Sequence, residues 1–330
     1  MRPFDYSRPT DAAAAVAEVS ADPGAAYLAG GTNLVDHLRL GVERPGRLVD
    51  LRSLLDDGVE ELPGGGLRIG AGTPNADLAA HPLVRRRHPM LSAALLSGAS
   101  GQVRNAATTG GNLLQRTRCP YFRNPATPCD KREPGTGCSA LEGHGRHNAV
   151  LGASRHCVAV HPSDMAVALT ALDARVRVLG PGGERVVPMP GLHRLPGEEP
   201  HRDTVLEHGE LITAVDLPDP PGGQRSAYRK VRDRASFAFA LVSVAAALEV
   251  DGGRVRRVRL ALGGVAHAPW RARRAEEALT GGPATEDAFR EAARAELADA
   301  RTGPDNAFKP GLAVSTVTAV LRDLAGEGDR

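Results

Sequence analysis

The sequence has few aromatic residues, little net charge and no long apolar run. Phe, Trp and Tyr make up 3% of its 330 residues, so the chain offers few platforms on which nucleic-acid bases could stack. Lys and Arg number 41 against 39 Asp and Glu, and the net charge of +2 gives no broad field that attracts a polyanion. No stretch reaches the ~18 apolar residues of a membrane span. We therefore expect neither a nucleic-acid partner nor a membrane span.

The amino terminus also lacks the apolar region of a secretory signal peptide, because MRPFDYSRPT leads directly into a helix pattern. Cytoplasmic residence is therefore the default expectation. Export together with a folded partner that carries its own signal would instead place the chain in the periplasm. Hydrophobic residues at 42% and charged residues at 24% are typical of globular chains, and this length favours two or three compact units.

The apolar periodicity indicates an α+β chain. Residues 25–51 have the pattern of a βαβ unit, and residues 59–73 alternate as a short strand or hairpin around PGGG. The segment 157–180 reads as a short strand, a helix and a strand. Further helices are predicted over 75–84, 90–99, 270–279, 285–298 and 311–325, and further strands over 210–218, 236–250 and 255–266. The run DPPGGQ at 219–224 is typical of a domain boundary.

Two glycine-containing turns are candidate anion sites. AGGTN at 29–33 follows a strand and opens a helix, where free backbone N–H groups and the helix dipole favour a phosphate. The turn lacks the GxGxxG spacing of a dinucleotide fingerprint, so a purely structural turn is an equal alternative. The second turn, ATTGGNLL at 107–114, repeats the same residue types. Two such turns in one chain favour contacts to both phosphates of a dinucleotide.

Asp164 and Lys230 are charged residues with an ordinary explanation and a functional one. Asp164 stands in the first turn of the helix HPSDMAVALTAL, where an acid commonly complements the helix dipole. The alternative is a carboxylate that accepts hydrogen bonds from a ligand. Lys230, in SAYRKVRDRASF, is more simply explained as a solvated strand residue than as a ligand contact.

The four cysteines, Cys119, Cys129, Cys138 and Cys157, cluster in one part of the chain without a CxxC pair. The apolar periodicity disappears over 115–148, and such a long structureless segment is uncommon unless something holds it. Disulfides are disfavoured in a reducing cytoplasm and stay a third possibility if the protein is exported. The clustering argues against four unrelated buried thiols, which favours a metal centre. Four thiolates suit tetrahedral zinc and an iron–sulfur cubane equally.

At these motifs the sequence resembles the medium, FAD-binding subunit of the molybdenum hydroxylases, the family of xanthine dehydrogenase, carbon monoxide dehydrogenase and aldehyde oxidoreductases. The resemblance runs nearly end to end. It is carried by YLAGGTNL at 27–34, GQVRNAATTGGNLL at 101–114, HPSDMAVAL at 161–169, ELITAVDLP at 210–218, YRKVRDRASFAFALVSVAAAL at 228–248 and LGGVAHAPWRARRAEEAL at 262–279. It implies a two-part FAD-binding domain over 1–58 and 59–220, and an α+β C-terminal domain over 221–330 of the CO dehydrogenase flavoprotein type.

The insertion at 115–157, with QRTRCPYFRNPATPCDKREPGTGCSA and HCVAVHPSD, resembles the bacterial periplasmic aldehyde oxidoreductase subgroup, whose flavin subunit also carries a [4Fe-4S] cluster. The resemblance implies that the four cysteines are its ligands. It also implies contacts to the FAD pyrophosphate by Ala29, Gly30, Gly31, Thr32, Asn33, Leu34, Thr108, Thr109, Gly110, Gly111 and Asn112. Asp164 would contact the adenosine half, while Ile212 and Lys230 would lie nearer the isoalloxazine ring.

The implied function is electron transfer. Nothing in the chain resembles a molybdopterin pocket or a plant-type [2Fe-2S] motif, so a large molybdopterin-binding subunit and a small [2Fe-2S] subunit are the expected partners in a heterotrimer. Aldehyde would be oxidised at molybdenum, and electrons would pass to FAD and then to an external acceptor. We expect no catalytic acid, base or nucleophile in this chain, with His161 as the first exception to test. The alternatives are a free-standing flavin oxidase and a zinc-stapled, non-catalytic binding module.

Overall fold

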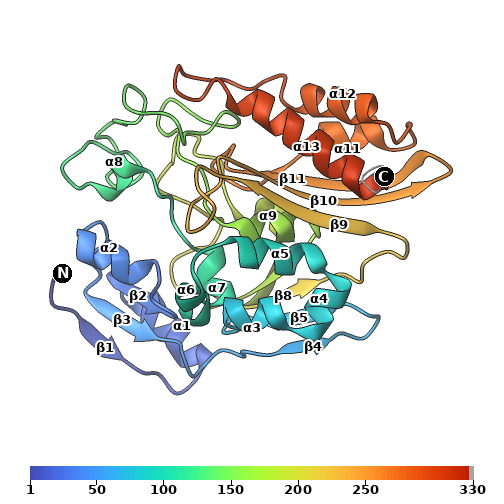
Figure 1. The fold of residues 1–330 in the computed structure, drawn as a ribbon. Coiled ribbons are helices and arrows are strands. Elements are labelled where there is room, and N and C mark those ends of the chain that lie inside the picture. Colours follow the sequence, from blue (N-terminus) through green and yellow to red (C-terminus); the bar gives the residue numbers. More distant parts are fainter. Residues whose placement is uncertain (327–330) are drawn as a thin grey trace.

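The computed structural model describes residues 1–326, which form an α+β fold around three β-sheets (Figure 1). The first sheet is parallel, with strands β1 (Asp5–Ser7), β2 (Ala25–Leu28) and β3 (Arg47–Asp50) in the order β1-β3-β2. Helix α1 (Ala12–Ala21) packs its buried Val16 and Val19 against this sheet, and α2 (Leu34–Leu40) connects β2 to β3. The predicted βαβ unit is therefore confirmed.

The second sheet has five antiparallel strands in the order β4-β5-β8-β6-β7. They are β4 (Val59–Glu61), β5 (Leu67–Gly70), β6 (Arg175–Gly180), β7 (Gly183–Pro188) and β8 (Leu211–Leu217). The helices between these strands are α3 (Asn75–Ala80), α4 (Pro82–Arg87), α5 (Pro89–Ser97), α6 (Gly101–Ala106), α7 (Thr109–Leu113), α8 (Pro120–Arg123), α9 (Asp164–Ala171) and α10 (Met189–Leu192). The apolar faces of α5 and α9 bury Leu91, Leu95 and Leu169 in the core of this part. The predicted hairpin at 59–73 is confirmed as β4 and β5.

The third sheet is antiparallel, with β9 (Arg225–Val231), β10 (Val242–Asp251), β11 (Arg254–Gly263) and β12 (Trp270–Arg271) in the order β12-β11-β10-β9. Helices α11 (Arg273–Leu279), α12 (Glu286–Glu296) and α13 (Lys309–Ala325) cover one face, while α5 and α9 pack on the other (Figure 1). This sheet thus joins the carboxy-terminal helices to the rest of the molecule. Each sheet lies within one of the three predicted units, and the exact division into domains stays a prediction.

Three sequence-based expectations about local structure need correction, one of them in full and two at the start of an element. Residues 157–160 form no strand, because their carbonyls accept from separate segments: Ser154 N donates to Cys157 O, and Ala149 N donates to Val158 O. The strand predicted over 236–250 begins only at Val242, because its partner β9 ends opposite it at Val231. The helix predicted over 270–279 is present as α11 but begins only at Arg273, after the short strand β12. None of the helices in the described part of the chain is both long and apolar enough to span a membrane.

Candidate cofactor-binding site

The two glycine turns lie against each other at the junction of the first two sheets. A Cβ atom on Gly30 would stand 1.8 Å from the carbonyl oxygen of Ala106, which directly precedes the second turn. Gly31 has φ +70°, a left-handed conformation that favours glycine. The glycines therefore let one backbone approach the other. The structure brings together the residues that the sequence assigned to a pyrophosphate site.

The two turns differ in the backbone donors that they offer. Within residues 1–326, the N–H groups of Gly31, Thr32 and Asn33 donate to no protein acceptor, so they remain available to an anion. In the second turn, Gly110 N donates to Ala71 O at 2.9 Å and Gly111 N donates to Thr108 Oγ1 at 3.2 Å. The first turn therefore offers free N–H donors. In the second turn the N–H groups of Gly110 and Gly111 are already paired, so these glycines line the site without donating to a ligand.

Two hollows lie beside the turns, and both are lined by Thr32, Asn33 and Gly111. The smaller hollow, of about 240 Å³, also includes Ile212. The larger one, of about 500 Å³, includes Asp164, Lys230, Leu95, Gly98, Val103, Phe237 and Phe239 among its walls. An elongated ligand laid across the turns would thus place one end in each hollow.

Lys230 and Asp164 form a buried ion pair in the larger hollow. Lys230 Nζ lies 2.7 Å from Asp164 Oδ2 and donates to Ser97 O at 3.1 Å, and both charged side chains are less than a tenth exposed. The prediction that Lys230 is a solvated strand residue is wrong, because β9 turns this side chain toward α5 and α9. The hydroxyl of Tyr228 also donates to Asp164, and burial together with this carboxylate raises the pKa of Tyr228 well above its usual range.

The sequence resemblance placed Asp164 at the adenosine half of FAD, and Ile212 and Lys230 near the isoalloxazine ring. This division stays a prediction, and the geometry does not favour it. Asp164 and Lys230 are in direct contact, so they belong to the same hollow rather than to opposite halves. Ile212 lines the other hollow, away from Lys230.

The four cysteine side chains line one small cavity on the edge of the molecule that carries α8. Its walls are Cys119, Cys129, Cys138, Cys157, Tyr121, Phe122, Pro128, Lys131, Ala140, His156 and Ala159. A β-bridge pairs Cys129 with Cys138 across the loop. All four are free thiols, and within residues 1–326 no three His, Cys, Asp or Glu side chains are already arranged to hold one metal ion.

Burial governs the chemistry of these thiols. It raises the pKa of Cys157 to about 12, against the opposing charge of Lys131, and it also raises the pKa of Cys119 and Cys138. Backbone N–H groups approach the sulfur atoms, and Ala159 N donates to Cys157 Sγ at 3.5 Å. Without a metal, the raised pKa keeps Cys119, Cys138 and Cys157 largely protonated, so these thiols react slowly with electrophiles. The thiolate form needs a cation beside it.

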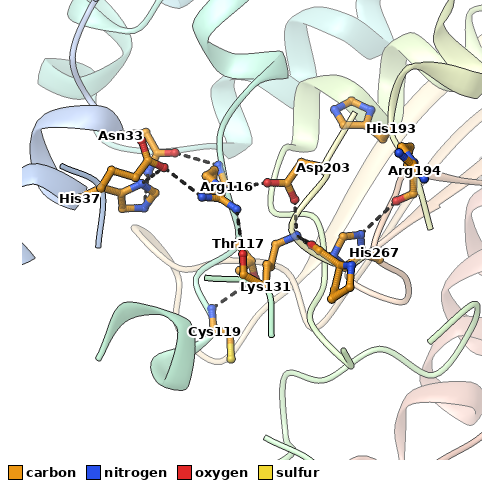
Figure 2. A network of polar contacts seen from close by, with 12 residues as sticks. Asn33, His37, Arg116, Thr117, Cys119, Lys131, His193, Arg194, Asp203 and His267 are labelled. Carbon is orange, nitrogen blue, oxygen red and sulfur yellow. Dashed lines mark hydrogen bonds and ion pairs between the residues drawn. The ribbon is translucent and has the colours of Figure 1, made fainter. Parts of the chain in front are cut away.

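A network of polar side chains runs from the first turn to the cysteine cavity (Figure 2). Asn33 Oδ1 accepts from Arg116 N at 2.8 Å, and Arg116 Nε donates to Asp203 Oδ2 at 2.8 Å. Asp203 also pairs with Lys131, which lines the cavity. Lys131 Nζ in turn donates to His267 Nε2 at 2.8 Å, in the C-terminal part of the chain. The network thus connects residues from all three predicted units.

His161 is half-buried and packs against another histidine. Its ring centroid lies 4.1 Å from that of His193, and its Nε2 has no partner among the described residues. Burial lowers the pKa of His161 well below its usual range, and the neighbouring His193 acts in the same direction. The ring is therefore neutral at physiological pH.

Sequence reasoning missed the residues that connect the two sites: Arg116, Lys131, Asp203 and His267. Arg116 stands two residues after the second glycine turn and Lys131 stands between two cysteines, so their positions carried a usable signal. Asp203 lies in an irregular segment after a proline-rich stretch, and His267 follows a strand. For those two the connection exists only in three dimensions.

The comparisons with known proteins agree with this arrangement. Residues 2–220 match the family described as FAD binding domain in molybdopterin dehydrogenase, and residues 226–324 match the CO dehydrogenase flavoprotein C-terminal domain. The chain is an FAD-binding medium subunit of the molybdenum hydroxylase family. This medium subunit is 50% identical, over 99% of its length and 100% of the relative's, to the aldehyde oxidoreductase FAD-binding subunit PaoB of Escherichia coli strain K12.

More distant relatives and solved structures of the medium subunit agree. The carbon monoxide dehydrogenase medium chain of Afipia carboxidovorans is 28% identical, over 91% of this chain and 87% of that one. A chain from the carbon monoxide dehydrogenase structure of Hydrogenophaga pseudoflava superposes with a TM-score of 0.77 at 27% identity, covering 99% of both chains. The resemblance and the α+β fold class inferred from the sequence are therefore confirmed, and the chain is an oxidoreductase subunit.

Proposed function

We propose that the chain carries both FAD and a [4Fe-4S] cluster as the electron-transfer subunit of a molybdenum-dependent aldehyde oxidoreductase. One observation carries this proposal: four cysteines line a single cavity, and hydrogen bonds and ion pairs connect that cavity to the first glycine turn. The half-identical relative, whose name is aldehyde oxidoreductase FAD-binding subunit, supports the enzyme class.

FAD fits the two turns and the two hollows. The free N–H groups of Gly31, Thr32 and Asn33 suit the pyrophosphate, because they concentrate partial positive charge at the start of α2. The close approach of Gly30 to Ala106 leaves no room for a side chain between the turns. Thr108 through Asn112 then form the opposite wall. Ala29 and Leu34 flank the donors on the first turn.

The isoalloxazine ring belongs in the larger hollow and the adenosine in the smaller one with Ile212. The larger hollow offers both apolar walls for a tricyclic ring and the charged pair Lys230 and Asp164 for its polar edge. Bound FAD supplies the exchange of electrons one or two at a time. Lys230 holds a positive charge in the ring's hollow, and Asp164 fixes the position of that charge. Phe237 and Phe239, whose side chains are exposed, add apolar surface to the wall of the same hollow.

The cysteine cavity fits a cluster on the chemistry of its donors. Four thiol sulfurs, a nearby ammonium and backbone N–H groups aimed at sulfur are the features that stabilise an anionic iron–sulfur centre. Such a centre also explains how a segment poor in apolar residues stays ordered. The ligands would be Cys119, Cys129, Cys138 and Cys157.

We further propose that the substrate reacts on other chains. The expected partners are a large molybdopterin-binding subunit and a small [2Fe-2S] subunit, which would deliver electrons to the FAD of this chain, and an external acceptor would then remove them. This division of labour requires no general acid, base or nucleophile here. The task of this chain is to position the redox groups and to tune their potentials.

Anaerobic purification followed by analysis of FAD, iron, acid-labile sulfide and zinc tests the proposal. We expect about one FAD with about four irons and four sulfides per chain. Cys157→Ser should remove the iron and sulfide and keep the FAD, whereas the exposed control Arg155→Gln should keep all three. Flavin without iron would favour a free-standing flavin oxidase. Zinc without flavin or sulfide would favour the binding module, and either result would contradict the proposal.

A further inference from the structure

Asp203 is the shared counterion of two cations that belong to different sites. Its Oδ2 accepts from Arg116 Nε at 2.8 Å, and its Oδ1 pairs with Lys131 Nζ (Figure 2). Burial opposes ionisation of the carboxyl, but the charges of Lys131 and Arg116 outweigh it and hold the pKa of Asp203 well below its usual range. The carboxylate is therefore charged at physiological pH, and it is the acidic partner that the two cations share.

The Arg116 end of this bridge touches the nucleotide turn directly. The backbone N–H of Arg116 donates to the side chain of Asn33, and Asn33 Nδ2 lies 3.2 Å from His37 Nε2. The guanidinium also contacts Glu43 Oε1 at 3.2 Å and lies over the ring of Phe122 at 4.7 Å. A shift of the first turn therefore moves Arg116.

The Lys131 end touches the cysteine cavity directly. Lys131 is 2% exposed, lines the cavity, and donates to Pro200 O at 2.9 Å as well as to His267 Nε2. Because His267 Nδ1 faces the carbonyl oxygen of Arg194 at 3.0 Å, that nitrogen carries the proton and Nε2 is the acceptor. Arg116 also donates to the backbone carbonyl of Lys131 at 3.4 Å. The position of the loop thus depends on both cations.

We infer that Asp203 is a positioning residue that couples FAD binding at the glycine turns to closure of the cysteine cavity. Bound FAD fixes the position of Asn33, and Asn33 fixes Arg116 through their hydrogen bond. Arg116 and Lys131 pair with the same carboxylate, that of Asp203, so a fixed Arg116 also fixes Lys131 and the cavity wall. Coupling of this kind is reciprocal, so a closed cavity also tightens FAD binding. The inference rests on the proposed binding of FAD, but it does not require that a cluster be present.

Alkylation of the metal-free full chain tests the coupling without activity as a readout. Iodoacetamide labelling is followed by peptide mass spectrometry at Cys138, which does not line the hollows beside the turns, so FAD cannot shield it directly. In the wild-type chain, saturating FAD should slow labelling of Cys138 by about tenfold, a coupling of ordinary size. In Asp203→Asn, which keeps the shape and removes the charge, FAD should slow it less than about twofold.

Two further variants separate coupling from general damage. Glu199→Gln removes an exposed acid of the same segment, paired with Arg194, and should keep the full protection. Asp203→Glu retains the charge and should recover part of the protection of Cys138 by FAD. Two outcomes would overturn the inference and leave the proposed function standing. One is protection of Cys138 that persists in Asp203→Asn, and the other is FAD that binds the wild-type chain without slowing the labelling. A wild-type chain that binds no FAD would overturn both the inference and the proposed function.

Discussion

The C-terminal part and the cysteine segment are stabilised by different physical means. Phe289 of α12 and Val317 and Leu321 of α13 are buried in one apolar cluster with residues of the third sheet, so apolar contact holds that part together. In the cysteine segment the contacts are polar: Arg132 donates to three backbone carbonyls, and Asp130 accepts from the N–H groups of Gly135 and Gly137. The first region depends on burial, and the second depends on charge and hydrogen bonding.

This difference has an energetic consequence. Apolar burial contributes roughly 25 cal/mol for each Å² removed from water, whatever the partner. A buried ion network gives little net stability, because desolvation opposes the Coulomb attraction, but it penalises wrong arrangements strongly. The cysteine segment is therefore built for defined geometry more than for stability. Such a design suits a loop that must hold ligands at fixed positions.

The largest effect is expected in the apolar part. Phe289 is fully buried, so Phe289→Ala should lower the free energy of unfolding by about 4 kcal/mol, through lost burial and the cavity left behind. Urea denaturation followed by circular dichroism measures the change. An effect below about 1 kcal/mol would contradict an apolar origin for the stability of this part.

Lys131→Met is expected to destabilise the cysteine segment by about 2 kcal/mol, because Asp203 and His267 lose their buried partner while Arg116 still compensates part of the charge. Hydrogen exchange should show faster opening of residues 115–160 and unchanged exchange in α12 and α13. Equal acceleration in both regions would contradict the distinction between them.

Acid should weaken the network through His267. Burial lowers the pKa of this imidazole from 6.5 to about 4, and the charge of Lys131 acts in the same direction. Between these two values the unfolded chain binds the proton that the folded chain excludes, so stability falls as the pH drops from 6.5 toward 4. His267→Gln should remove about 2 kcal/mol of the loss seen at pH 5. Urea titrations of both proteins at pH 7 and pH 5 measure the free energy of unfolding. An equal loss between the two pH values in the wild type and the variant would contradict the role of His267.

The smallest effect is expected at the surface of α12. Arg290 pairs with Glu286 one turn away, and both side chains are more than a third exposed. Arg290→Ala should change the free energy of unfolding by no more than about 0.5 kcal/mol, because water screens such pairs. Urea denaturation at low and high salt measures it. A change above about 1.5 kcal/mol would show that charge contributes more to the C-terminal part than the comparison allows.

The sequence predicted the parts in which neighbours along the chain determine the structure. The βαβ unit, the hairpin and the helix that begins at Asp164 all follow from local periodicity and turn residues, and the structure has them. The strand expected over 157–160 failed because Cys157 points its sulfur into the cavity while the flanking residues bond to separate loops. Periodicity cannot register a constraint of that kind.

The site was predictable at its turns and its cysteines but not in its connections. The paired glycines predict that two stretches of backbone lie close together, and in the structure Gly30 lies against the backbone of Ala106. Lys230 looked solvated because its strand is charged, and only the packing of β9 on α5 and the ion pair with Asp164 of α9 reveal its burial. The pairing of Asp203 with Arg116 and Lys131 joins positions 87 and 72 residues apart in the chain.

Transient absorbance of the flavin after mixing with aldehyde tests most directly whether this chain is an electron-transfer subunit. The complete complex, purified with its molybdenum and [2Fe-2S] subunits, should show bleaching of the flavin of this chain within the time of one turnover. The FAD-loaded chain alone should stay oxidised in the same aldehyde. Bleaching of the isolated chain by aldehyde, or a flavin that stays oxidised while the complex turns over, would contradict the account.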